Sequence, residues 1–150
     1  MCDLISKALN GSKERYRGED LDLLFALCCR HKVSALVSTV IDKKCSNHKD
    51  WENVLSLSIL RKTHMDFERE KLTSSFRDNG IWYLFMKGLV LEQLYPDTYL
   101  REMCDNDILY DRKAYKLVRS FMLENGYTIE NSSKDVHVDE YSKKPYFRFE

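Results

Sequence analysis

Two aspartates one residue apart, Asp105 and Asp107, are the strongest candidates for chemistry in this sequence, and Asn106 separates them. On a β-strand, alternate side chains point to the same face, so these carboxylates would project together with their Cα atoms about 7 Å apart. Like charges so placed repel unless a cation neutralises them, and Mg²⁺ takes oxygen ligands while keeping positions for waters and phosphates. The pair predicts a site for Mg²⁺ or Mn²⁺, with a solvated turn before a strand as the alternative.

A second group, Lys87, Gly88 and Arg101, has residue types suited to binding phosphate. The aromatic-rich run at residues 81–86 predicts a buried strand, and Lys87-Gly88 then leads into a helix whose N-terminal N–H groups would face a triphosphate. Gly88 lets the backbone approach closely, and Lys87 would supply a point charge, although a solvated lysine is the alternative. Arg101 would contact a phosphate or support the two carboxylates.

The elements before Gly80 are expected to be helical. Apolar residues recur at helical spacing over residues 19–44, with a break at His31-Lys32, which predicts a helical hairpin. A longer amphipathic pattern covers residues 50–78 and stops at Asn79-Gly80, which is typical of a helix end.

After Gly80 the predicted order is strand (81–86), helix (89–95, ended by Pro96), strand (105–110) and helix (112–125, ended by Gly126). The last helix is expected to bury one apolar face, made of Ala114, Leu117, Val118, Phe121 and Met122. Two weaker strands follow at residues 136–141 and 146–150, joined by a hairpin connection at 142–145.

This order predicts an α+β protein in which a helical region (1–79) packs on a core (80–150) with a small mixed sheet. Because the sequence ends inside a predicted strand, a core truncated after Glu150 is one interpretation.

Composition excludes some function classes. The 150 residues hold 24 Lys plus Arg and 24 Asp plus Glu, so no overall field attracts nucleic acid or a membrane, and general nucleic-acid binding is not expected. Five cysteines without paired C-x-x-C spacing indicate reduced thiols. No apolar run is long enough for a signal peptide or a membrane helix, so we expect a soluble, cytoplasmic protein.

Four short motifs carry a resemblance to a known family. They are Phe85-Met86-Lys87-Gly88, Tyr95-Pro96 with Arg101, Asp105-Asn106-Asp107-Ile108-Leu109, and Glu124-Asn125-Gly126-Tyr127. With them, the stretch from Gly80 to Tyr127 resembles the uncharacterised bacterial nucleotidyltransferase-like family of the polymerase-beta-type superfamily. The resemblance extends loosely over residues 23–41.

The resemblance implies a nucleotidyltransferase fold and transfer of a nucleoside monophosphate from a nucleoside triphosphate to an unidentified acceptor hydroxyl. It assigns the metal to Asp105, Asp107 and a third carboxylate, for which Glu150 has the expected position and Asp139 and Glu140 are runners-up. Glu150 would also take the proton of the attacking hydroxyl.

Two departures keep a second interpretation open. Leu89 stands where the wider superfamily has Ser, and Asn106 stands where an apolar residue is usual, so its amide must find partners or cost about 1–3 kcal/mol. The alternative is a catalytically inactive nucleotide-binding or protein-interaction module, with the N-terminal helices as a surface for a protein partner.

Overall fold

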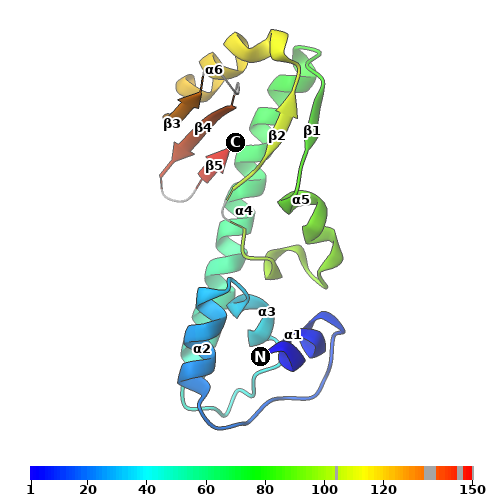
Figure 1. Ribbon diagram of the computed structural model, residues 1–150, viewed down its shortest axis with the longest axis vertical. Helices are drawn as coiled ribbons and strands as arrows, with labels where there is room; N and C mark the ends of the chain where they lie inside the picture. The colour runs from blue at the N-terminus through cyan, green and yellow to red at the C-terminus, as the bar shows by residue number, and fades with distance from the viewer. Residues whose placement is uncertain (104, 134–137, 145–146, 150) are drawn as a thin grey trace. The chain divides into compact units, whose positions relative to one another are not determined.

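The structure is a computed structural model that describes residues 1–103, 105–133, 138–144 and 147–149 (Figure 1). The chain forms two compact units. The first unit comprises Met1–Lys62 and Leu91–Met103, and the second comprises Thr63–Val90 and Cys104–Glu150. The predicted division of the chain after residue 79 stays a prediction.

Helices form most of the first unit, and the predicted helical hairpin is confirmed. α2 (Leu21–Arg30) and α3 (Ser34–Ser38) are separated at the expected place, where Lys32 has a φ of 56°. α3 is shorter than expected, because the pattern was followed to residue 44. Most of the buried apolar side chains of this unit form one cluster: Leu4, Ala8, Cys28, Leu36, Val37, Val40, Ile41, Trp51 and Leu100.

One helix of the first unit, α1 (Cys2–Leu9), is absent from the sequence prediction. Its buried residues are Leu4 and Ala8, and the helix packs against α3. Two buried positions in eight residues make too short a pattern to indicate a helix, and so short a helix depends on tertiary packing for its stability.

α4 (His48–Asp78) is the long helix that the amphipathic pattern predicted. It begins two residues earlier than expected and ends before Gly80, whose φ of 61° suits a glycine after a helix. Its first part belongs to the first unit and its remainder, from Thr63, to the second.

In the second unit, β1 (Tyr83–Phe85) and β2 (Ile108–Tyr110) form a two-stranded antiparallel sheet with Tyr83 opposite Tyr110. Figure 1 shows this pair running beside the later part of α4. The Phe76 ring of α4 lies 5.4 Å from Tyr83 and 5.8 Å from Tyr110, measured between ring centroids. Both strands are shorter than predicted, so the two aspartates precede β2 instead of lying within it.

The segment between these strands is helical, as expected, but broken. α5 (Gly88–Leu91) continues into a 3-10 helix at Glu92–Leu94, and a further 3-10 turn forms at Thr98–Leu100.

A second sheet contains β3 (Thr128–Ser133), β4 (Val138–Lys143) and β5 (Phe147–Phe149) in that order. The β4–β5 pairing confirms the predicted hairpin, whereas β3 is absent from the sequence prediction. The predicted mixed sheet is wrong for the described residues, because every strand pairs antiparallel with its neighbour and the five strands divide into two sheets. Helices with small antiparallel sheets confirm the α+β class.

α6 (Tyr115–Glu124) follows a 3-10 turn at Arg112–Ala114 and confirms the last predicted helix. Val118 and Met122 are buried as expected, but Leu117 is 44% exposed, so its predicted inward position is wrong. Among the described residues, no helix is long and apolar enough to cross a membrane.

Candidate functional site

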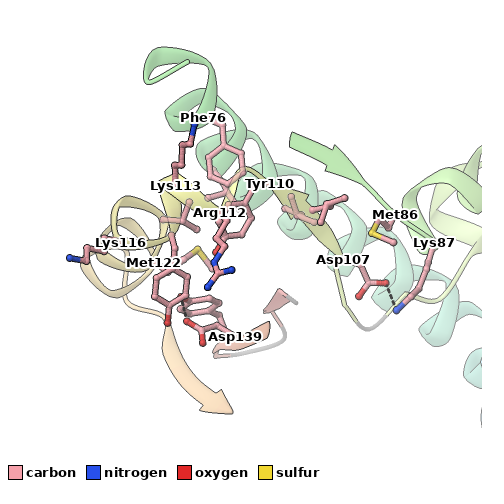
Figure 2. Close-up of a pocket in the computed structure, with 16 residues that line it drawn as sticks. Phe76, Met86, Lys87, Asp107, Tyr110, Arg112, Lys113, Lys116, Met122 and Asp139 are labelled. Atoms are coloured by element: carbon pink, nitrogen blue, oxygen red, sulfur yellow. Dashed lines mark hydrogen bonds and ion pairs between the residues drawn. The ribbon is translucent and has the colours of Figure 1, made fainter. Parts of the chain in front are cut away.

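The second unit contains a cavity of about 960 Å³, and residues of the candidate site line this cavity (Figure 2). Apolar and aromatic side chains form most of its wall: Leu72, Phe76, Met86, Ile108, Leu109, Tyr110, Tyr115, Val118, Met122 and Tyr141. Its charged lining residues are Lys87, Asp107, Arg112, Lys113, Lys116 and Asp139. Burial is the main cause that raises the pKa of Tyr110 to about 12. The phenol is therefore protonated at neutral pH and can donate a hydrogen bond.

Asp107 and Lys87, which the sequence analysis assigned to a metal and to a phosphate, lie together at one end of this cavity. Lys87 Nζ lies 3.1 Å from Asp107 Oδ2. The Asp107 side chain is only 12% exposed, and its other oxygen, Oδ1, is buried with no hydrogen-bond partner in the described chain. The backbone fixes this arrangement, because Met86 N donates to Asp107 O over 3.0 Å.

Lys87 occupies an unusual backbone conformation for a residue with a side chain. Its φ is 42°, in the left-handed region, at the turn from β1 into α5. This region is disfavoured for residues other than glycine, with Asn and Asp as the common exceptions. The turn therefore aims the lysine at Asp107 at a conformational cost, while the adjacent Gly88 begins the helix.

Asp105 is half-buried and lies two residues before Asp107 in the segment that leads into β2, outside the cavity lining. Across the described ranges, no cluster of three or more His, Cys, Asp or Glu side chains is arranged to hold a metal ion. The described carboxylates thus offer Asp107, with Asp105 close in sequence, and not a complete set of three.

Asn106 faces inward between the two aspartates, in the position where the family resemblance implies an apolar residue. It is 1% exposed. Arg69 Nη1 lies 3.5 Å from its Oδ1, and its Nδ2 finds no hydrogen-bond acceptor in the part of the chain that the structure describes. The amide is therefore only half satisfied.

Asp139 lies at the other end of the cavity, well apart from Asp107 in Figure 2. Its side chain is buried, accepts a hydrogen bond from Tyr141 Oη at 2.9 Å and forms an ion pair with Arg119 at 3.3 Å. Burial alone would raise the pKa of Asp139, but hydrogen bonds from Ser132, Tyr141 and Tyr115, together with Arg119, hold the pKa below its usual value.

The remaining predicted residues lie elsewhere. Arg101 is in the first unit, where its guanidinium carbon lies 6.0 Å from the Tyr95 ring centroid. Glu140, a runner-up, accepts a hydrogen bond from Asn131 at 2.7 Å. Glu150, the proposed third carboxylate, falls outside the described residues, and its role stays a prediction.

Sequence reasoning missed Arg112 as a functional residue. It begins the helical segment after β2, and Figure 2 shows its guanidinium turned into the cavity. The available signal was the basic cluster Arg112-Lys113 with Lys116, which is equally typical of a solvated helix face.

Comparison with known proteins identifies the family. A model of the uncharacterised nucleotidyltransferase family matches residues 17–150, and the chain belongs to this family. A search of curated proteins and a search of solved structures each found no match.

Proposed function

We propose that this nucleotidyltransferase-family protein moves a nucleoside monophosphate from a nucleoside triphosphate to an acceptor hydroxyl, with Mg²⁺ or Mn²⁺ held by Asp107 and Asp105. The observation that carries the proposal is the state of Asp107 at the end of the cavity. One of its oxygens pairs with Lys87 and the other is buried without a partner among the described residues.

The half-paired carboxylate fits a divalent cation. A buried oxygen without a partner costs about 1–3 kcal/mol, more where the group is charged, and a hard cation would satisfy it. When bound, the ion would neutralise negative charge on the phosphates. Asp107 and Asp105 would hold it, and Glu150 is the proposed third ligand.

Lys87 and Gly88 are proposed to bind the phosphates. The Lys87 side chain is 68% exposed although its ammonium group pairs with Asp107, so it can reach a phosphate oxygen without leaving the carboxylate. Gly88 has no Cβ to obstruct a phosphate at the backbone. The phosphate contact expected of Arg101, which belongs to the first unit, stays a prediction.

Glu150 is the residue proposed to accept the proton of the acceptor hydroxyl. Asp139 is a poorer candidate, since Arg119 and Tyr141 already occupy its oxygen Oδ2. A lowered pKa also makes a carboxylate a weaker proton acceptor.

A non-catalytic nucleotide-binding module is the second candidate. The observation that favours it is the lack of a three-carboxylate group over the described ranges. Such a module would bind nucleotide with metal and release no pyrophosphate.

A cytoplasmic location and a protein partner on the N-terminal helices also remain proposals.

Calorimetric titration of ATP, GTP, CTP and UTP, each with Mg²⁺ and again with EDTA, tests the proposal. We expect metal-dependent binding that is lost in Asp107→Asn and kept in Asp78→Asn, a matched change of an exposed aspartate at the end of α4. Equal binding by Asp107→Asn and the unmodified protein would refute the assigned site. Pyrophosphate release then separates the enzyme from the binding module.

A further inference from the structure

The cavity has an imbalance of charge that the proposed nucleotide site does not explain. Asp107 is neutralised by Lys87, and Asp139 is neutralised by Arg119. Three more basic residues line the cavity: Arg112, Lys113 and Lys116. Within the described parts of the chain, none of these three forms an ion pair, so the cavity carries an excess of positive charge.

Arg112 is an exposed residue of the lining that is placed to direct its charge toward the cavity. Its guanidinium points inward, whereas the Lys116 amine points outward (Figure 2). The wall of the cavity is mainly apolar and includes Tyr110, Val118 and Met122. A guanidinium has five N–H donors and no acceptor, so an oxyanion is the complementary ligand.

A phosphoryl group matches this setting better than a carboxylate. The planar guanidinium forms two parallel charge-assisted hydrogen bonds to a phosphate or to a carboxylate, so the charge around it decides between the two ligands. Lys113 and Lys116 also line the cavity and add two positive charges, which favours a dianion over a singly charged acid.

The size of the cavity leaves room for a second substrate. Pockets for small ligands occupy about 300–1,000 Å³, and this cavity, at about 960 Å³, is near the upper limit. Lys87 and Asp107 lie together at one end, while Arg112 lies toward the end that holds Asp139 (Figure 2). A transferase must hold donor and acceptor side by side.

We propose that Arg112 binds a phosphoryl group of the acceptor, so that the acceptor is a phosphorylated hydroxyl compound such as a sugar phosphate. This inference rests on the proposed function, since it takes the Lys87–Asp107 end as the place of the donor triphosphate. Lys113 and Lys116 strengthen the positive potential of the cavity and need not contact the ligand.

Ribose 5-phosphate is a suitable probe because it carries both a hydroxyl and a phosphoryl group, and ribose is its uncharged control. Binding is followed by NMR titration of the whole chain in the unmodified protein, Arg112→Gln, Arg112→Lys and Arg30→Gln. Arg30 is an exposed arginine of α2 outside the cavity lining, so its variant removes the same charge elsewhere.

We expect ribose 5-phosphate, and not ribose, to bind. Arg112→Gln should weaken binding at least about tenfold, Arg112→Lys should weaken it less, and Arg30→Gln should leave it unchanged. Unchanged binding by Arg112→Gln, or no binding by the unmodified protein, would overturn the proposal.

A parallel titration with Mg²⁺ and the preferred nucleoside triphosphate separates the two hypotheses. If Arg112 serves the acceptor, Arg112→Gln binds the triphosphate normally, whereas a loss there would assign Arg112 to the donor and overturn the inference. Loss of triphosphate binding in Asp107→Asn belongs to the proposed function and does not bear on Arg112.

Discussion

The two carboxylates at opposite ends of the cavity are both largely shielded from solvent, with side chains 12% exposed at Asp107 and 3% at Asp139, but their surroundings are very different. Asp139 has a hydrogen bond from Tyr141 and an ion pair with Arg119, whereas Asp107 has Lys87 on one oxygen and nothing on the other among the described residues. A buried carboxylate with its partners in place is part of the structure. One that still has a buried oxygen to satisfy is the better candidate for a ligand site.

The largest expected difference between the two carboxylates lies in catalysis. Asp107→Asn should lower nucleotidyl transfer at least about a hundredfold, because the proposed metal site would lose a negatively charged ligand. Its thermal stability should change little, since the removed charge was only half paired. Turnover measured by pyrophosphate release, with circular dichroism as a control for folding, checks both parts; turnover within a few-fold of the unmodified protein would reverse the assignment.

Asp139→Asn should show the opposite pattern, with a loss of stability of about 2 kcal/mol as its charged hydrogen bonds weaken. Triphosphate binding should be retained if the protein is folded at the assay temperature. Urea unfolding measures the stability, and a variant as stable as the unmodified protein would contradict a structural role. A loss of triphosphate binding in a folded variant would instead place Asp139 in the donor site.

A smaller effect is expected at Asn106, whose buried Nδ2 has no acceptor in the described chain. Asn106→Leu keeps nearly the same shape and removes that unsatisfied group, so we expect a gain of about 1 kcal/mol in the free energy of unfolding. Arg69 loses only a long contact of 3.5 Å and retains its ion pair with Asp66. Urea unfolding again decides, and a destabilised variant would show that the amide has a partner in solution.

The smallest expected effect is the change with pH in the stability that Asp139 contributes. Because the folded pKa of Asp139 is lowered, its contribution to stability is present above the unfolded pKa, about 3.9, and is lost as the pH falls through the folded value. The difference in stability between the unmodified protein and Asp139→Asn should therefore shrink below about pH 4. Thermal melts from pH 7 to pH 3 measure it, and a difference independent of pH would mean that the pKa of Asp139 is not shifted by folding.

The sequence predicted the parts of this molecule that depend on long local patterns. α4 has 31 residues, and its apolar positions repeat often enough to define the helix and its end at Gly80. β3 was missed because Thr128–Ser133 is mostly polar and forms a strand by pairing with β4. Pairing partners distant in the sequence are not visible in a local pattern.

The same limit applies to the candidate site. Lys87 and Asp107 could be predicted because each belongs to a short motif beside a strand, and the structure brings them together. Arg112 and the buried position of Asp139 depend on how α6 and β4 enclose one cavity. The spacing of residues along the sequence does not indicate that these elements enclose one cavity.

The backbone at Lys87 has a consequence for protein engineering. With its φ of 42°, this position would accept glycine with less strain, so a library selected only for thermal stability should enrich Lys87→Gly. A library selected for nucleotide transfer should reject it, because glycine brings no ammonium group to Asp107. Enrichment of glycine at position 87 in the first selection and its loss in the second would show that Lys87 is kept for its side chain and not for the conformation of its turn.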